Sequence, residues 1–146
     1  MKTSDKGINL IKSFEGLRLS AYKPISTEKY YTIGYGHYGE DVKAGSKITE
    51  QQATDLLKKD IAKFESGVTS VLKGKNICQH KFDALVSFAY NVGLNNFNKS
   101  TLLKKVLANP CDKTIKDEFM KWVNAGGKKL EGLVRRRKAE SELYFG

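Results

Sequence analysis

A stretch rich in β-forming residues and glycines, 17–48, interrupts a chain whose apolar residues otherwise follow helical spacing. Its strongest strand formers and the glycines among them are Tyr30, Tyr31, Thr32, Ile33, Gly34, Gly36 and Gly39. Such short runs, ended by glycine, predict two or three short antiparallel strands. Because helical segments precede and follow this β-rich stretch in the sequence, the sequence predicts an α+β fold with two lobes.

Start and stop residues divide the rest of the chain into helices. The first predicted helix begins after Ser4 or Asp5 and stops at Gly16. Thr49 opens a capping box, T-E-Q-Q, which predicts a long helix to about Phe64. Apolar spacing predicts further helices at about 79–92, 100–107, 114–123 and 133–144.

The predicted organisation is one domain, 1–146. With 146 residues, 40% of them apolar, the chain has the usual length of one domain and enough apolar residues for a core. A small β lobe of about 14–48 is followed by a connecting helix of about 49–66. A helical lobe of about 67–146 completes the domain, and we expect residues 1–13 to pack on it.

The chain is strongly basic. Lysine and arginine number 26 against 16 aspartates and glutamates, which gives a net charge of +10. This excess favours encounters with polyanions, among them nucleic acid, an anionic membrane surface and an acidic cell-wall polymer. A nucleic-acid function would rest only on this charge and on the basic run 135–138, whose side chains point around a helix. We therefore predict no nucleic-acid partner.

Cysteine usage and the N-terminus exclude several further classes. Cys78 and Cys111 are the two cysteines and belong to no CxxC motif or Cys/His cluster, so we predict no metal site. Both a disulfide between them and two free thiols are compatible with the sequence. Residues 1–19 contain no apolar run of signal-peptide or transmembrane length, so we expect a soluble protein without stable membrane insertion.

Glu15 is the first candidate catalytic residue. It falls at the end of the first predicted helix, where the helix dipole disfavours a carboxylate, and a residue placed against local preference indicates function. A carboxylic acid with apolar neighbours, as here, can serve as a general acid. Thr32 and His37 of the YTIGYGH stretch do not indicate a catalytic site when each is taken alone. The order of a glutamate, a short hairpin and this stretch strengthens the prediction of a site.

Six segments, in order along almost the whole chain, carry a resemblance to a known family. They are FEGLRLSAY (14–22), YYTIGYGH (30–37), ITEQQATDLL (48–57), FDALVSFAYNVG (82–93), FNKSTLL (97–103) and FMKWVNAGGKKLEGLVRRRKAE (119–140). In them the sequence resembles the phage-type lysozymes of glycoside hydrolase family 24. The resemblance implies a lysozyme-like fold, with a small antiparallel sheet lobe and a helical lobe joined by a long helix. It also implies that no cofactor is needed.

The resemblance assigns roles to individual residues. It implies that Glu15 is the general acid and that Thr32 helps to position the catalytic water. Family members usually carry an aspartate after an AYK stretch. Here that position holds Pro24 or Ser26, depending on the end from which the longer loop is counted. The candidates for the second catalytic group that stay open are Glu28, Ser26 and Asp41. The implied sugar contacts are Tyr38, Tyr90, Asn91 and Ser100.

Two hypotheses for the function follow. The first is an endolysin, a monomer that hydrolyses the β-1,4 bond between N-acetylmuramic acid and N-acetylglucosamine in peptidoglycan. We would expect it to stay in the host cytoplasm until a holin gives it access to the cell wall or periplasm. The second is a catalytically weakened module of the same fold that binds peptidoglycan without cutting it, and Pro24 favours this reading.

Overall fold

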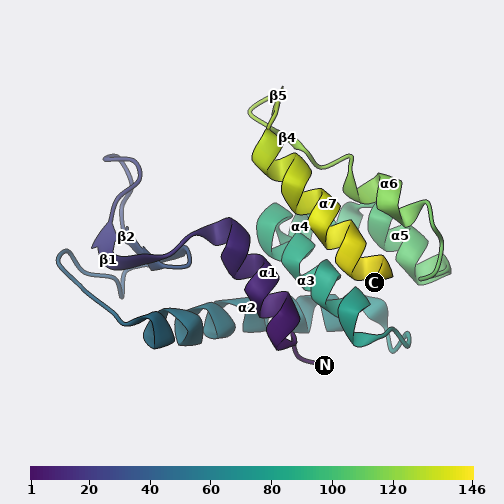
Figure 1. Ribbon diagram of the computed structural model, residues 1–146, viewed down its shortest axis with the longest axis horizontal. Helices are drawn as coiled ribbons and strands as arrows, with labels where there is room; N and C mark the ends of the chain where they lie inside the picture. Colours follow the sequence, from purple (N-terminus) through teal and green to yellow (C-terminus); the bar gives the residue numbers. More distant parts are fainter. The chain divides into compact units, whose positions relative to one another are not determined.

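The structure, a computed structural model, describes all residues of the chain, 1–146 (Figure 1). The elements in order are α1 (Asp5–Glu15), β1 (Arg18–Tyr22), β2 (Tyr31–Gly34), β3 (His37–Gly39), α2 (Glu50–Leu72), α3 (Gln79–Val92), α4 (Leu94–Lys99), α5 (Thr101–Ala108), α6 (Ile115–Phe119), β4 (Asn124–Ala125), β5 (Lys128–Lys129) and α7 (Glu131–Phe145). The predicted α+β class is confirmed. No helix is both long and apolar enough to cross a bilayer.

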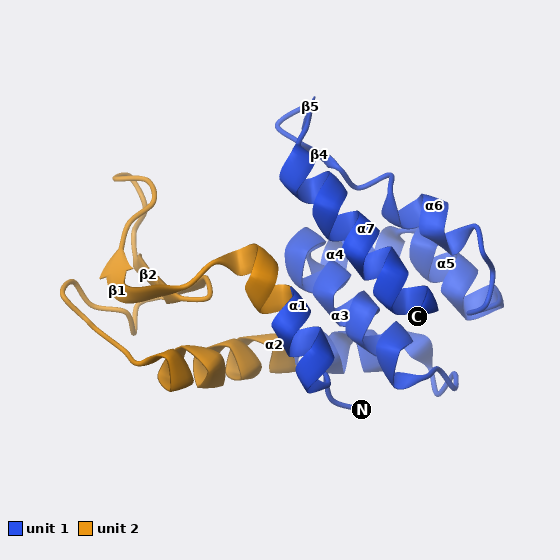
Figure 2. Cartoon of the chain, in the orientation of Figure 1, with its two compact units in different colours: residues 1–10, 63–146 blue, residues 11–62 orange.

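The chain divides into two compact units, which Figure 2 shows in blue and orange. The helical unit comprises residues 1–10 and 63–146, and the sheet unit comprises residues 11–62. The boundaries fall inside α1 and α2, so each of these two helices contributes residues to both units.

The sheet unit holds the three predicted strands in the order β1-β2-β3, all antiparallel. Thr32 lies opposite Tyr22 of β1 and opposite Tyr38 of β3. The pairing of β1 with β2 contains a bulge, because Arg18 lies opposite Gly34 and the register shifts before Tyr22. The apolar side chains buried in this unit include Ile11, Ile33, Val42, Ala53, Leu57 and Ile61.

The predicted capping box starts α2. The Thr49 N–H donates to Gln52 Oε1 at 2.8 Å, and the Gln52 N–H donates to Thr49 Oγ1 at 3.1 Å. The predicted end near Phe64 is wrong, because α2 continues to Leu72. Buried Val68 and Leu72 extend its apolar face, and Gly67 does not break the helix.

The helical unit is built around α3, in which every residue from 82 to 89 is buried. α7 packs along α3, as Figure 1 shows. The Phe88 ring lies at the centre of an aromatic cluster, with edge-to-face contacts to Phe97, Phe119 and Trp122 at centroid distances of 6.2, 5.5 and 5.6 Å. Cys78 and Cys111 are exposed free thiols, so no disulfide joins them.

The segment 94–130 differs most from the sequence-based expectation. A short helix, α4, lies in a region for which we predicted none. The helix predicted over 114–123 is only Ile115–Phe119. The chain then forms a hairpin in which Asn124 pairs with Lys129. Its turn is Gly126-Gly127, with φ values of +59° and +78°, the combination that a tight two-residue hairpin requires.

The N-terminal turn of α1 packs against α3 within the helical unit. Ser4 caps α1, because its Oγ accepts from the Gly7 N–H at 3.4 Å and its carbonyl accepts from the Ile8 N–H. The Ser4 hydroxyl and N–H both donate to the carboxylate of Asp83 on α3. This close approach leaves no room beside Gly7. A Cβ there would lie 2.6 Å from Thr3 Cγ2 and 2.8 Å from Asp83 Cβ.

We expect Gly7→Ala to lower the free energy of unfolding by about 1–2 kcal/mol. Overpacking of this kind costs about 1–3 kcal/mol, and the helix propensity of alanine offsets up to about 1 kcal/mol of that. Asn9 is an exposed residue of the same helix, so Asn9→Ala is the matched control and should be neutral within about 0.5 kcal/mol. Urea unfolding of both variants checks the prediction, and equal stability would contradict it.

Candidate active site

Glu15 is the last residue of α1 and is half-buried. Its carboxylate oxygen Oε2 is shielded from solvent. Gly16 follows with φ +70°, a conformation that glycine adopts without strain, and the chain then turns into β1. The carboxylate therefore sits at the negative end of the helix dipole, against the preference of the helix.

Thr32 is a buried residue in the central strand of the sheet. Its neighbours across the sheet are Tyr22 and Tyr38. The loop 23–30 leaves β1 at Tyr22 and returns to β2 at Tyr31. The register therefore places this loop at the end of the sheet where Thr32 lies.

The loop 23–30 carries two of the three candidates for the second catalytic group. Glu28 is half-buried, and its N–H closes a turn by donating to the Ile25 carbonyl at 3.0 Å. Its carboxylate takes part in no ion pair within the protein. Ser26 is exposed. Lys23 and Lys29 at the two ends of the loop lie over the rings of Tyr31 and Tyr30, with Nζ-to-centroid distances of 4.9 and 5.2 Å.

The third candidate, Asp41, is bound to His37. His37 Nε2 lies 2.8 Å from Asp41 Oδ2, and His37 Nδ1 lies 2.8 Å from Asp60 Oδ2. Because both ring nitrogens face carboxylates, the two contacts favour the imidazolium form of the ring, in which both nitrogens donate. Burial alone would lower the His37 pKa, but the hydrogen bonds to Asp41 and Asp60 outweigh burial and raise it. The hydrogen bond from His37 lowers the Asp41 pKa.

We expect the cluster of His37, Asp41 and Asp60 to make the free energy of unfolding depend on pH in two opposite ways. The His37 pKa lies above its ordinary value of 6.5, so its stabilisation is complete below that pH and is lost as the pH rises through the folded-state pKa. The Asp41 pKa lies below its ordinary value of 3.8, so its stabilisation is present above that pH and is lost as the pH falls through the folded-state pKa. Both contributions are therefore present between about pH 4 and pH 6.5.

Urea unfolding of the parent and of His37→Gln at about pH 5.5 and about pH 8.5 measures the first of these effects. The parent should lose on the order of 1 kcal/mol more than the variant between the two conditions, because the Asp41 side chain is 63% exposed and its pairing is screened by solvent. The same pH dependence in both proteins would contradict the prediction.

The predicted sugar contacts lie in different surroundings. Tyr38 is 46% exposed, packs its ring edge against Tyr30 and accepts a hydrogen bond from the Tyr30 N–H at its hydroxyl. Ser100 is buried and caps α5, accepting from the Leu103 N–H and donating to the Phe97 carbonyl. The capping role explains the two hydrogen bonds of the Ser100 hydroxyl, and a contact of Ser100 with sugar stays a prediction.

The other two predicted contacts come from the end of α3. Tyr90 is half-buried and packs edge-to-face on Phe64 at a centroid distance of 5.1 Å. Asn91 is exposed, and its Oδ1 accepts a hydrogen bond from Arg137 Nη2. The four predicted contacts thus divide between the units, with Tyr38 in the sheet unit and the others in the helical unit.

Known proteins identify the family of this chain. The sequence matches the phage lysozyme family over residues 12–140, a range that contains every predicted site residue. The chain belongs to the phage lysozyme family. The endolysin of Bacillus phage B103 is 54% identical over 145 residues, which cover 99% of this chain and 54% of that protein. The chain thus spans about half the length of this relative and of the endolysin of Bacillus phage PZA, which is 52% identical.

Solved structures of similar sequence share the fold. The muramidase domain of SpmX from Asticaccaulis excentricus has a TM-score of 0.87 and 33% identity, covering 99% of this chain and 98% of that one. The endolysin from Escherichia coli O157:H7 phage FAHEc1 has a TM-score of 0.85 and 38% identity, covering 99% and 93%. The predicted phage-lysozyme fold, with a small sheet lobe and a helical lobe, is confirmed.

A buried ionic network on α7 was not predicted from the sequence. Arg136 and Arg137 are buried, although they lie in a basic run that we expected to point around a helix. Glu140 contacts both, accepting from Arg137 Nη1 at 2.6 Å and from Arg136 Nε at 3.2 Å. The Ser87 hydroxyl on α3 donates to the same carboxylate at 2.6 Å. The spacing of Glu140 three and four residues after the arginines is the signal that could have indicated it.

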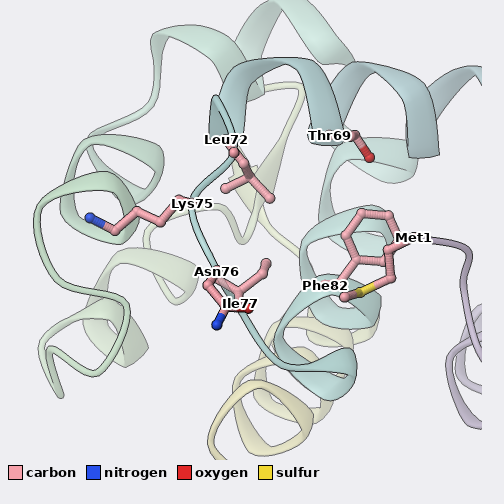
Figure 3. Close-up of a pocket in the computed structure, with 8 residues that line it drawn as sticks. Met1, Thr69, Leu72, Lys75, Asn76, Ile77 and Phe82 are labelled. Carbon is pink, nitrogen blue, oxygen red and sulfur yellow. The ribbon is translucent and has the colours of Figure 1, made fainter.

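A hollow of about 300 Å³ lies in the helical unit, and Figure 3 shows its lining. Met1, Leu72, Ile77 and Phe82 make it mainly apolar. Lys75 points away from Met1 and Phe82, and its Nζ donates to the Leu107 carbonyl at 2.5 Å. No carboxylate and no predicted site residue lines the hollow, so it offers no acid or base for glycoside hydrolysis.

Proposed function

We propose that the chain is a peptidoglycan hydrolase that cleaves the β-1,4 bond between N-acetylmuramic acid and N-acetylglucosamine, with Glu15 as the general acid. The observation that carries the proposal is the position of Glu15. Its side chain ends α1 at an unfavourable place for a carboxylate, with Oε2 shielded from water. A general acid for glycoside hydrolysis needs a carboxyl group held beside the bond that breaks rather than one solvated by bulk water.

The names of the relatives support the same activity. Relatives over the length of this chain are named endolysins, and the SpmX domain is named a muramidase domain. A net charge of +10 suits a wall polymer that carries carboxylates. In the proposed role the protein acts as a monomer and waits in the host cytoplasm until a holin opens the membrane. It needs no cofactor and no nucleic-acid partner.

We propose that Thr32 positions the attacking water and that Glu28 supplies the second carboxylate. Glu28 belongs to the loop that starts and ends beside Thr32, and its carboxylate is not engaged in an ion pair. Asp41 is a weaker candidate because its carboxylate binds His37 at 2.8 Å. Ser26 is exposed in the same loop and could orient water only through its hydroxyl.

The bond that is cut distinguishes this function from its rivals. Purified peptidoglycan is digested with the protein, reduced with borohydride and hydrolysed to its amino sugars. A muramidase produces muramitol, whereas a glucosaminidase produces glucosaminitol and an amidase or peptidase releases free amino groups. Muramitol is the expected product. Either of the other products would overturn the assignment.

A peptidoglycan-binding module without catalysis is the second candidate. Pro24 or Ser26 at the aspartate position favours it, since neither residue provides a charge for the reaction. Sedimentation of the protein with walls that release no reducing ends, even after long incubation, would support this module over the enzyme.

A further inference from the structure

A hollow at the C-terminal end of α7 combines a mainly apolar lining with positive charge. It has a volume of about 360 Å³, at the lower end of the range for ligand sites. Phe145, Lys113 and Lys116 line it. Phe145 is the last residue of α7, Lys113 precedes α6 and Lys116 lies in α6, so two segments of the helical unit form the hollow. No residue of the candidate active site and no carboxylate lines it.

The Phe145 ring is both held in place and accessible. It packs edge-to-face on the ring of buried Tyr144 at a centroid distance of 4.9 Å. The Lys81 ammonium group, from α3, lies 5.0 Å from the Phe145 centroid and donates to the Tyr144 carbonyl at 3.1 Å. Phe145 is nevertheless 37% exposed. An apolar ligand would therefore meet a ring whose position is already fixed, which lowers the entropy cost of binding.

The two lysines supply positive charge that the protein does not use internally. Lys113 and Lys116 are exposed, and neither forms an ion pair within the protein. Asp112 and Asp117 lie next to them in the sequence but do not line the hollow. The Asp112 carboxylate accepts hydrogen bonds from the N–H and the hydroxyl of Thr114 at 2.9 and 2.7 Å. An anion that enters the hollow therefore meets two ammonium groups and no carboxylate.

We propose that this hollow docks the protein on a membrane surface by binding an anionic phospholipid. The ammonium groups of Lys113 and Lys116 bind the lipid phosphate as point charges. Phe145 and the methylene groups of the two lysines contact the glycerol and the first acyl carbons, at the boundary between headgroups and acyl chains. The docking is peripheral, since only side chains reach this boundary. The inference does not depend on the proposed function, because it uses no residue of the candidate active site.

The apolar lining is what favours a lipid over other polyanions. A wall polymer that carries only charged and hydroxyl groups would use the two lysines but not the Phe145 ring. Single-stranded nucleic acid is bound by several aromatic rings along a basic groove, whereas this hollow contains one ring. A phospholipid uses both parts of the hollow, the charge and the ring. The net charge of +10 adds a long-range attraction to an anionic membrane surface.

Sedimentation with lipid vesicles tests the charged part of the hollow. The vesicles contain phosphatidylglycerol and phosphatidylcholine, and vesicles of phosphatidylcholine alone are the neutral control. The variant is Lys113→Gln/Lys116→Gln, and the matched control is Lys128→Gln/Lys129→Gln, which removes two exposed lysines of β5 outside the hollow. We expect the first to weaken binding to the anionic vesicles about 10- to 30-fold and the second less than about threefold. Equal losses in the two variants would overturn the proposal, and so would equal binding of the parent to both kinds of vesicle.

Phe145→Ser tests the apolar part of the hollow. Salt does not screen an apolar contact, so the parent should keep part of its vesicle binding at high salt and the variant should lose it. Soluble short-chain phosphatidylglycerol should compete with the vesicles at least about tenfold better than glycerophosphoglycerol, which has the same phosphate diester without acyl chains. Equal competition by the two would assign the hollow to a free phosphate and overturn the proposal. Urea unfolding shows whether each variant is folded, and the lysine variant and the competition decide the question if Phe145→Ser is not.

Further arms of the experiment separate the other occupants and the two proposals. Displacement of the vesicles by purified wall polymer or by a single-stranded oligonucleotide at lower concentrations than the short-chain lipid would assign the surface to that polyanion and overturn the inference. A dimer in solution that Phe145→Ser dissociates would assign the hollow to a second copy of the chain. Because purified walls contain no membrane, muramitol release should be equal in the two lysine variants. Muramitol release without lipid binding would refute only this inference, and lipid binding without muramitol would refute only the proposed enzyme.

Discussion

Replacing Glu15 by glutamine is expected to lower the rate of wall hydrolysis roughly 10²- to 10⁴-fold, the usual contribution of a general acid. Glutamine has nearly the same shape as glutamate but has no acidic proton for the leaving glycosidic oxygen. The loss should therefore appear in kcat, with little change in KM, because glycan binding does not require the proton. The measurement is the initial rate of muramitol release from purified walls, with thermal unfolding recorded for each protein to confirm that it is folded.

A matched variant separates this chemical effect from the loss of a negative charge. Glu40 is an exposed glutamate of the same unit, directly after β3, and Glu40→Gln should keep the parent's rate. A Glu15→Gln variant that retains more than half of the parent's rate would show that another residue donates the proton. The structure contains no other carboxylate that ends a helix immediately before the first strand.

The same assay tests the loop 23–30. If Glu28 supplies the second carboxylate, Glu28→Gln should lose activity well beyond the loss in Glu40→Gln. If Thr32 and the Ser26 hydroxyl position the water without a carboxylate, Glu28→Gln should retain activity and Ser26→Ala should lose it. Asp41→Asn removes a partner of the His37 imidazolium, so its effect should appear first in stability.

Local chemistry made much of the fold predictable from the sequence. The capping box at Thr49 forms both of its reciprocal bonds, and Gly16 ends α1 with a positive φ. The glycine-rich β segment produces three strands in one small antiparallel sheet. Each of these features depends on residues within a few positions of one another, which is the range over which the sequence alone is informative.

Features that depend on distant residues were not predictable in this way. α2 extends past Gly67, and the side chain of Leu94, from α4, occupies the space that a larger residue at 67 would need. His37 is held by Asp60, 23 positions later. The hairpin after Phe119 is different, because it is a local feature that we did not predict although Gly126 and Gly127 favour its tight turn.

The same distinction between local and distant residues applies to the candidate site. Glu15 and Thr32 were identified through contiguous motifs, and the structure places one at a helix end and the other in the central strand. The oriented amide of Asn91 depends on Arg137, 46 positions away, and was beyond the reach of a motif. The side chains of the basic run 135–138 were expected only to point around a helix. The spacing of Glu140 could have indicated its ion pairs with two of these arginines, but no motif indicates that Ser87 on α3 completes the buried network.

Glu140→Gln is expected to lower the free energy of unfolding by about 3–5 kcal/mol, because it removes one partner of a buried ion pair. Arg137 Nη1 lies 2.6 Å from Glu140 Oε1, and the two side chains are 1% and 0% exposed. Burial lowers the Arg137 pKa and the Glu140 charge opposes that effect, so the carboxylate is what compensates the guanidinium for its lost hydration. Since domains are stable by only about 5–15 kcal/mol, this loss would be a large share of the total.

The control is Glu142→Gln, an exposed glutamate on the same helix, which should change stability by less than about 0.5 kcal/mol. Urea unfolding of both variants gives the comparison. If Glu140→Gln costs no more than Glu142→Gln, the carbonyl of Trp122 and the oxygen of Asn91 are sufficient partners for Arg137. Those two hydrogen bonds would then hold Arg137 in place without the charge of Glu140.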